Sequence, residues 1–337
     1  MPGAPVAGRG GCYIGRMSLT GLRQPRFIQL YHEDRAALRQ ELAGGLLATP
    51  ARTSPKYLYD PLGSRLFDAI TELPEYYPTR TEAALLVAHG AAIAAEVPKG
   101  ATLVDLGAGN CEKAARLFGL LQPARYVAVD ISVDYLNNAL QCLQRQFPAL
   151  DMLGVGLDFS SQLALPPEVG EGPRLLFYPG SSIGNFTPEE ALVFLRQVRA
   201  QAQGGGLLIG VDLVKPTDVL QAAYDDALGV TAAFNKNLLL HINRVLGSDF
   251  AVHDWSHVAF FNAAASRIEM HLQARREITV RWPGGERRFA QGERIHTENS
   301  CKYALADFQA LLAAAGFARV QAWTDERGWF AMYWAQG

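Results

Sequence analysis

The sequence has 337 residues, a mass of 36.7 kDa, 31 basic and 33 acidic residues, and a formal net charge of −2. Its hydrophobic fraction of 49% and charged fraction of 19% are typical of a globular protein with a sizeable core, which excludes disorder over most of the chain. The near-neutral charge argues against a nucleic-acid partner and gives no reason to expect an anionic membrane surface as partner. At roughly 150 residues per domain, the length allows one large domain or two moderate ones.

The sequence contains no targeting or membrane signal. No uncharged apolar stretch reaches the ~18 residues of a membrane span, and the first residues carry no apolar run typical of a secretory signal. Residues 1–25 are expected to form an extended or disordered lead, with Met17 as an alternative start to Met1. We expect a cytoplasmic protein with reduced thiols, because the four cysteines are far apart in sequence.

No metal site is expected. No Cys/His pair has the spacing of zinc ligands. His253 and His257 have the i, i+4 spacing of one helical face, but no glutamate lies between them and no third ligand is evident. The remaining candidates, His241, His271 and His296, are interpreted as surface residues of strands or helices.

In chain order, the middle of the sequence alternates short apolar segments with helical ones. The predicted strands are 102–107, 126–130, 153–157, 174–178 and 206–213. The predicted helices between them are 112–121, 133–147 and 188–203. Strands that alternate with helices predict an α/β fold with a parallel, doubly wound sheet.

The C-terminal segment changes this pattern. A helix over 306–315 is stopped by Gly316, and the strands 318–324 and 329–334 are separated by a short turn. Two adjacent strands with a short turn predict an antiparallel hairpin. A parallel sheet that ends in such a hairpin is the Rossmann-like layout of class I methyltransferases.

The flanking segments do not fit that sheet. Residues 26–80 contain predicted helices near 34–47 and 63–71, and residues 215–300 contain helices followed by alternating segments. We expect the two pieces to form a discontinuous α+β domain for the substrate. The methyltransferase domain then comprises residues 81–214 and 301–337.

Three of the predicted strands end in residues that suit a nucleoside ligand. The first ends in Asp105-Leu-Gly107-Ala-Gly109, where glycines let the backbone approach a ligand closely. The second ends in Asp130, about 20 residues further on, near the spacing of a ribose-hydroxyl acceptor. The third ends in Asp158-Phe159, where a carboxylate and a backbone amide can bind adenine. Any one aspartate is more simply a turn former, but together they predict a site for S-adenosylmethionine.

Two further features bear on this cofactor. The glycine turn lacks the three-glycine dinucleotide fingerprint, so a phosphate cradle is the weaker interpretation. Lys113, one turn into the next helix, is either a solvated surface lysine or a partner for the cofactor's methionine carboxylate.

Longer motifs are distributed over most of the chain. They are Tyr59-Asp60, Leu73–Arg80, Asp105–Gly109 with Glu112-Lys113, Gly180–Asn185, Asp212–Lys215, Tyr224–Asp226, Gly229–Thr231, Arg267–Met270 and Thr297–Lys302. On these motifs the chain, from about Tyr57 to its C-terminus, resembles the histidine Nα-methyltransferases of ergothioneine biosynthesis. The same family contains fungal enzymes that N-methylate a prenylated tryptophan, so a tryptophan derivative is the alternative substrate.

The resemblance implies an activity and a set of site residues. The activity is transfer of three methyl groups from S-adenosylmethionine to the α-amino nitrogen of L-histidine, through mono- and dimethylated intermediates, giving hercynine and S-adenosylhomocysteine. The enzyme is expected to be a monomer. The residues implied for the cofactor are Gly107, Lys113, Asp130, Asp158 and Phe159. Those implied for histidine are Tyr76, Asn185, Tyr224, Glu298 and Ser300, with Tyr59, Asn185 and Gly180 near the reacting amine and Met270 lining the imidazole pocket.

The residue types suit this chemistry. Methyl transfer needs an unprotonated amine and good alignment rather than a strong general base. Glu298 and Ser300 are two residues apart, so on a strand they point to the same face and can bind both imidazole nitrogens. The alternatives are that both are solvated strand residues, and that Asn185 caps the helix that follows it.

Overall fold

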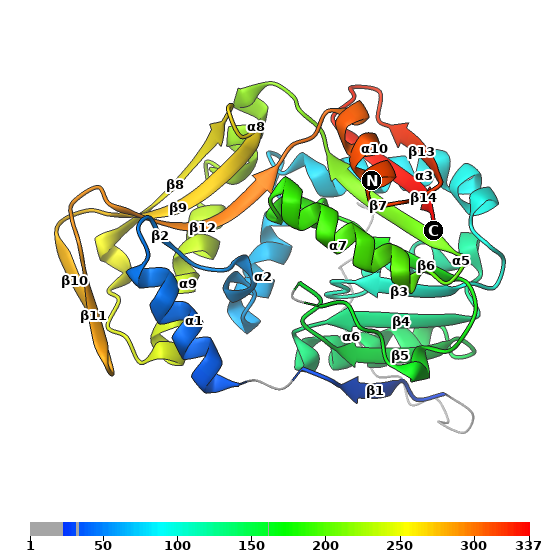
Figure 1. Cartoon of the computed structure of the whole chain (residues 1–337), viewed down its shortest axis with the longest axis horizontal. Coiled ribbons are helices and arrows are strands. Elements are labelled where there is room, and N and C mark those ends of the chain that lie inside the picture. Colours follow the sequence, from blue (N-terminus) through cyan, green and yellow to red (C-terminus); the bar gives the residue numbers. More distant parts are fainter. Residues whose placement is uncertain (1–22, 32–33, 161) are drawn as a thin grey trace, which may run out of the picture.

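The centre of the molecule is an eight-stranded sheet in the order β1-β5-β4-β3-β6-β7-β14-β13 (Figure 1). In this computed structural model the described residues are 23–31, 34–160 and 162–337. The strands of the sheet are β1 Arg26–Gln29, β3 Thr102–Leu106, β4 Arg125–Asp130, β5 Asp151–Gly156, β6 Arg174–Tyr178, β7 Gly206–Asp212, β13 Arg319–Thr324 and β14 Phe330–Gln336. The first six in this order run parallel, and β14 lies antiparallel to both β7 and β13. This confirms the predicted parallel sheet with a C-terminal hairpin.

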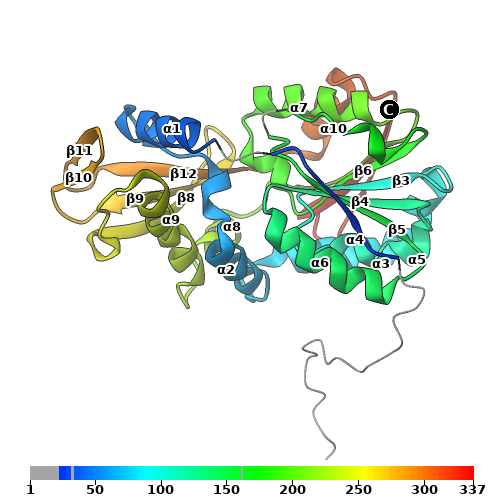
Figure 2. The ribbon, with the colours of Figure 1, turned by 90° about the horizontal axis from the view of Figure 1, so that it is seen from below.

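Helices cover both faces of this sheet, which explains why β6 and β7 at its centre are buried at every residue. Figure 2 shows that different helices cover the two faces. The first group is α7 Pro188–Gln201 and α10 Leu305–Ala314, and the second group is α3 Tyr77–Glu96, α4 Glu112–Ala115, α5 Phe118–Leu121 and α6 Val133–Gln146. Each face has its own apolar core. The single helix predicted over 112–121 is wrong, because the Leu117 amide donates to the Ala114 carbonyl in a tight turn that separates α4 from α5.

A second unit contains a four-stranded sheet in the order β2-β12-β9-β8 and the hairpin β10-β11 (Figure 1). Its strands are β2 Ala51–Arg52, β8 Trp255–Asn262, β9 Arg267–Ala274, β10 Ile278–Trp282, β11 Gly285–Phe289 and β12 Arg294–Cys301. Its helices are α1 Arg35–Leu47, α2 Pro61–Thr71, α8 Thr217–Tyr224 and α9 Val230–Leu246. The described residues of the two units together also contain four 3₁₀ turns, η1 Pro55–Leu58, η2 Pro167–Val169, η3 Ser182–Asn185 and η4 Val252–Asp254. A third apolar core joins the two separated pieces of sequence in this unit.

The expected limit of this unit at residue 26 is wrong for the first strand. β1 pairs in parallel with β5 at the edge of the large sheet. There Phe27 lies opposite Gly154, and a Cβ atom at Gly154 would come within 2.4 Å of the Phe27 ring. The lead expected over residues 1–25, including Met17, lies almost wholly outside the described residues. Among the described helices, none is both long and apolar enough to cross a membrane.

Two neighbouring glycines of α1 differ in how closely they approach β2. A Cβ atom at Gly44 meets nothing within 4 Å, whereas one at Gly45 would lie 2.4 Å from the carbonyl oxygen of Arg52 in β2. We expect Gly44→Ala to raise the free energy of unfolding by about 0.4–1 kcal/mol, because alanine favours a helix. Gly45→Ala should lower it by about 1–3 kcal/mol, because α1 must move away from β2. Urea unfolding of both variants measures this, and equal effects would contradict the close approach of α1 to β2.

Candidate active site

A pocket lies where the second unit faces the loop that follows β6. It is lined by Tyr59, Phe67, Ile70, Tyr76, Gly180, Ser181, Ser182, Asn185, Ala223, Tyr224, Thr231, Phe234, Met270, Glu298 and Ser300. The structure therefore brings together all eight residues that the sequence suggested for the substrate and the reacting amine. Aromatic side chains form much of this lining.

A β-bulge in β12 turns Glu298 and Ser300 toward this pocket. His296 pairs with His271 of β9, but Glu298 pairs with Met270, so the register shifts by one residue between them. Strand residues alternate between faces, and the extra residue reverses that alternation. Glu298 and Ser300 consequently share the face of Met270, as their spacing predicted, while Asn299 pairs with Glu269 on the other face.

Glu298 has a buried carboxyl group, and one of its oxygens can still accept a hydrogen bond. Its Oε2 atom has no hydrogen-bond partner among the described residues. Burial raises the pKa of Glu298 to about 8, and the positive charge of Lys302 only partly opposes that rise. The carboxyl group is therefore available to a ligand that brings its own hydrogen-bonding nitrogen into the pocket.

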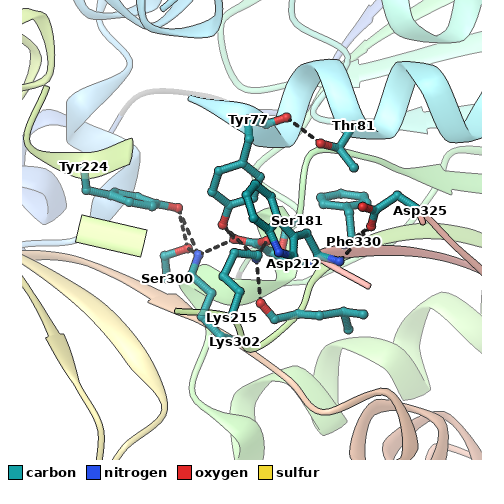
Figure 3. Close-up of polar contacts among 12 residues, drawn as sticks. Tyr77, Thr81, Ser181, Asp212, Lys215, Tyr224, Ser300, Lys302, Asp325 and Phe330 are labelled. Atoms are coloured by element: carbon teal, nitrogen blue, oxygen red, sulfur yellow. Dashed lines mark hydrogen bonds and ion pairs between the residues drawn. The ribbon is translucent and has the colours of Figure 1, made fainter. Parts of the chain in front are cut away.

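Tyr224 and Ser300 form the floor of the pocket beside Glu298. The Tyr224 hydroxyl lies 2.7 Å from Ser300 Oγ (Figure 3). Tyr224 ends α8, and its backbone carbonyl is 2.9 Å from His257 Nε2 of β8, which fixes the end of the helix against the small sheet. Ser300 and Tyr224 thus come from segments 76 residues apart but act as one polar surface.

Tyr59 and Tyr76 enter the pocket from two ordered turns. Asp60 caps α2 by accepting from the Gly63 amide at 2.7 Å and from Asn237 of α9 at 2.6 Å, which places the preceding Tyr59. Arg80 donates to the Tyr76 carbonyl at 3.2 Å and also to the carbonyls of Leu73 and Pro74. Burial raises the pKa of both phenols, so each stays a neutral donor.

Asn185 does not cap the helix that follows it. Thr187 caps α7, because its side chain accepts from the Glu190 amide while Glu190 accepts from the Thr187 amide. Asn185 instead ends the turn η3 and lines the pocket. Gly180 precedes this turn with a φ of 75°, a conformation that favours glycine.

The carboxyl edge of the large sheet carries the residues suggested for the cofactor. Gly107 and Gly109 have φ angles of 72° and 52°, and a Cβ atom at Gly109 would meet nothing within 4 Å, so the turn leaves room for a ligand. Asp130 accepts from the Gly109 amide at 3.0 Å and from the Ser132 amide at 2.8 Å, as a turn former does. Its buried carboxylate therefore shapes the turn and borders the space in front of it, which suits a nucleoside.

Asp158 and Phe159, which follow β5, likewise form a turn beside the residues suggested for the cofactor. Asp158 accepts from the Ser160 amide at 3.1 Å, and the Phe159 ring packs edge-on against Tyr178. Phe159 also lies 3.6 Å from the position of a Cβ atom at Gly107, so the first and third strand ends meet.

Glu82 is a site residue that the sequence did not single out. Its buried carboxylate accepts from Lys113 Nζ at 2.8 Å and from the Gly180 amide at 2.7 Å. Glu82 thus connects the cofactor edge to the loop that lines the pocket. The one indication in the sequence was its position in α3, two residues after the Leu73–Arg80 motif.

Two further buried charges were also missed, because a lysine and a strand-terminal aspartate are ordinarily read as surface groups. Lys302 Nζ lies 2.7 Å from Asp212 Oδ2, and both side chains are almost fully buried. Figure 3 shows Lys302 between Asp212 and the pair formed by Ser300 and Tyr224.

The histidines are arranged differently from the expectation. His253 lies in η4 and His257 in β8, so they do not share a helix face. His271 and His296 are not surface residues but pack together, with ring centroids 5.0 Å apart, beside Glu269. The oxygens of Glu269 already accept from Arg267, Asn262 and His271, and the Arg267 cation neutralises the carboxylate. This cluster is therefore explained as a packed polar face without a metal ion.

The raised pKa of Glu298 predicts how stability changes with pH. Between about pH 4.3, where an unfolded glutamate titrates, and about pH 8, the folded protein keeps a proton that the unfolded chain has lost. The free energy of unfolding therefore falls as the pH rises through this range. Glu298→Gln removes the effect, so its stability relative to the wild type should increase by up to about 1.4 kcal/mol per pH unit and level off above about pH 8.

Glu269→Gln is the matched control. Burial would raise the pKa of Glu269, but hydrogen bonds from Arg267, Asn262 and His271 hold it at about 2. Its contribution is complete above about pH 4.3 and is lost only as the pH falls toward 2. Urea unfolding across about pH 5 to 8 should show a pH-dependent difference for the first variant and a constant one for the second. A constant difference for Glu298→Gln would show that this carboxyl group is not perturbed.

Comparison with known proteins identifies the family of the chain. A family model described as "Histidine-specific methyltransferase, SAM-dependent" matches residues 38–337. The histidine N-alpha-methyltransferase of Mycolicibacterium smegmatis is 43% identical over 303 residues, which cover 88% of this chain and 94% of that protein. The corresponding protein of Mycobacterium tuberculosis is 42% identical with the same coverage. The N-methyltransferase dtpB of Aspergillus flavus is 26% identical over 323 residues, 90% of each chain. The chain, whose large sheet has the class I layout, therefore belongs to the family of histidine-specific, S-adenosylmethionine-dependent methyltransferases.

Proposed function

We propose that this protein transfers three methyl groups to the α-amino nitrogen of L-histidine, giving hercynine, the first step of ergothioneine biosynthesis. The observation that carries the proposal is the pair formed by Glu298 and Ser300. Both face one pocket, one with an open carboxyl oxygen and the other with a hydroxyl group. A carboxyl group and a hydroxyl group side by side match the two nitrogens of an imidazole ring.

This pair supports selection of histidine over apolar amino acids. An imidazole can give its N–H to Glu298 and accept from Ser300, so every buried polar group is satisfied. An apolar side chain would leave the Glu298 carboxyl oxygen unpaired, at a cost of about 1–3 kcal/mol, and would offer Ser300 no acceptor. Met270, opposite Glu298, supplies the apolar wall against which the ring packs.

The backbone end of the amino acid would lie at the adjoining wall. Asn185, Tyr76 and Tyr224 line that wall with an amide and two neutral phenols, which can donate to a carboxylate. Gly180 is joined through Glu82 to Lys113, so this wall is also the one nearest the cofactor edge. A histidine bound in this direction presents its α-nitrogen to the cofactor.

The chemistry requires alignment and an unprotonated amine. S-adenosylmethionine supplies the methyl group on a sulfonium carbon. An α-amino group has a pKa of about 7.7–8.0, so modest desolvation among Tyr59 and the other aromatic walls yields the free amine near neutral pH. We propose that Tyr59 and Gly180 orient this amine, and that Gly107, Lys113, Asp130, Asp158 and Phe159 hold the cofactor and its product, S-adenosylhomocysteine.

We further propose that the second unit, with residues 34–80 and 215–300, is the substrate domain. It supplies Tyr59, Tyr76, Tyr224, Glu298 and Ser300, while the large sheet supplies Asn185 and the cofactor edge. Separate units suit an enzyme whose closed pocket must open for a new substrate. The monomeric state stays a prediction.

A second candidate is N-methylation of a tryptophan derivative, since the similar proteins include fungal N-methyltransferases. An indole has a single N–H donor and no acceptor nitrogen. It can use Glu298 but offers the Ser300 hydroxyl no acceptor nitrogen, so the pocket favours histidine.

Mass spectrometry of the product tests the proposal. Incubation with S-adenosylmethionine and L-histidine should add three methyl groups to histidine, while tryptophan and its derivatives should gain none. Methylation of tryptophan derivatives but not of histidine would reverse the assignment.

Glu298→Ala tests the role of the carboxyl group. Loss of its hydrogen bond should weaken L-histidine binding roughly 10- to 100-fold and leave cofactor affinity nearly unchanged, as measured by calorimetry. Asn299→Ala is the matched control, because Asn299 is adjacent on β12 but lies on the other face, where it contacts His296 at 2.8 Å. Equal loss of cofactor and histidine affinity in Glu298→Ala would refute this role.

A further inference from the structure

A buried ammonium group lies directly beneath the polar floor of the pocket. The Lys302 side chain has no exposed area, and its Nζ atom lies 2.7 Å from Asp212 Oδ2, 2.7 Å from Ser300 Oγ and 3.2 Å from the Tyr224 hydroxyl (Figure 3). Lys302 does not line the pocket itself. It contacts the two hydroxyl groups that do.

The chemistry of an ammonium group fixes the direction of these hydrogen bonds. A lysine has three N–H donors and no acceptor, so Ser300 and Tyr224 must both accept from Lys302. Each hydroxyl then has its own proton left to donate. In the empty pocket one of them donates to the other across 2.7 Å. A ligand that replaces this contact can receive both protons.

Asp212 prevents the ammonium group from turning away. It ends β7 and accepts from Lys302, from Lys215 and from the Tyr77 hydroxyl of α3, the last at 2.7 Å. Burial alone would raise the pKa of Asp212, but the charges of Lys302 and Lys215 hold it below its usual value. The carboxylate therefore stays ionised and keeps one N–H of Lys302 engaged.

We propose that Lys302, held by Asp212, is a positioning residue that makes Ser300 and Tyr224 donors toward a bound amino acid, and that the pocket therefore selects the neutral imidazole of histidine over imidazolium. This inference rests on the proposed function. Tyr224 donates to the substrate carboxylate, and Ser300 donates to the ring nitrogen that carries no proton.

The selection follows from the two groups that face the ring. A neutral imidazole has one N–H for Glu298 and one lone pair for Ser300. An imidazolium ion would bring its second N–H and its positive charge to Ser300, and the Lys302 ammonium group lies only 2.7 Å from that hydroxyl, so the two buried cations repel each other. One buried ammonium group thus orients the two hydroxyl groups that bind the carboxylate and the ring of the substrate.

The charge state of the ring is the observable that a merely structural lysine would not change. The charged and titratable groups facing Lys302 are Asp212 and Lys215 at the end of β7, Tyr77 of α3, Tyr224 of α8 and Glu298 of β12. These groups surround Lys302 in the wild type, so its spectrum reports their combined effect on the bound ring. At about pH 6, free imidazole is mostly protonated, so a neutral bound ring reports the pocket and not the solution.

Nitrogen-15 NMR of labelled L-histidine, bound in the presence of S-adenosylhomocysteine at about pH 6, tests the proposal. The wild type should hold one neutral tautomer, with one protonated and one unprotonated ring nitrogen. A bound imidazolium in the wild type would overturn the inference without the need for any variant. A wild type that does not methylate histidine would instead refute the proposed function, so the two failures are distinguishable.

Two variants complete the test. Lys302→Met removes the ammonium group and should weaken histidine binding roughly 10- to 100-fold. Imidazolium should appear in the bound spectrum, because no buried positive charge beside Ser300 then opposes a protonated ring. Lys215→Met is the matched control, since Lys215 pairs with the same Asp212, equally buried, but contacts neither Ser300 nor Tyr224. It should weaken histidine binding less than Lys302→Met does and leave the bound ring neutral, because Ser300 and Tyr224 keep the ammonium group that donates to them. Equal losses in both variants, or a neutral ring in Lys302→Met, would overturn the proposal.

Discussion

The arrangement of the site depends on one buried carboxylate, that of Asp212. It lies at the end of β7 and binds Tyr77 at the start of α3, Lys215 in the following turn, and Lys302 just after β12. Three segments that are distant in sequence are thereby fixed at one point. Removing one partner of such a buried ion pair typically costs about 3–5 kcal/mol. Because Tyr76 precedes Tyr77 and Ser300 lies two residues before Lys302, this contact also positions two walls of the pocket.

A pocket of this kind suits a small zwitterion. It offers hydroxyl groups, an amide and a carboxyl group rather than a catalytic dyad, and Glu82 connects it to the cofactor edge. Alignment of an amine with a methyl donor can lower a barrier by about 7–11 kcal/mol, so positioning alone supplies much of the catalysis. The near-neutral charge of the chain agrees with a substrate that carries no large net charge.

Local patterns in the sequence predicted most of the fold and the inward-facing pair. The strands of the large sheet follow from short apolar runs, and the shared face of Glu298 and Ser300 follows from their spacing. The bulge after His296 did not follow, because an extra residue leaves no mark in a periodic pattern. Lys302 was missed because burial of a lysine depends on a carboxylate 90 residues away, and the four residues of β1 were too few to indicate which sheet they join.

The central claim is that one pocket orients L-histidine with its imidazole on the small sheet and its amine toward the large one. A crystal structure with S-adenosylhomocysteine and L-histidine tests this most directly. The account predicts imidazole nitrogens within hydrogen-bond distance of Glu298 and Ser300, and the α-nitrogen beside Gly180, facing the cofactor sulfur. An imidazole ring that faces the sulfur, or a histidine bound outside this pocket, would contradict it.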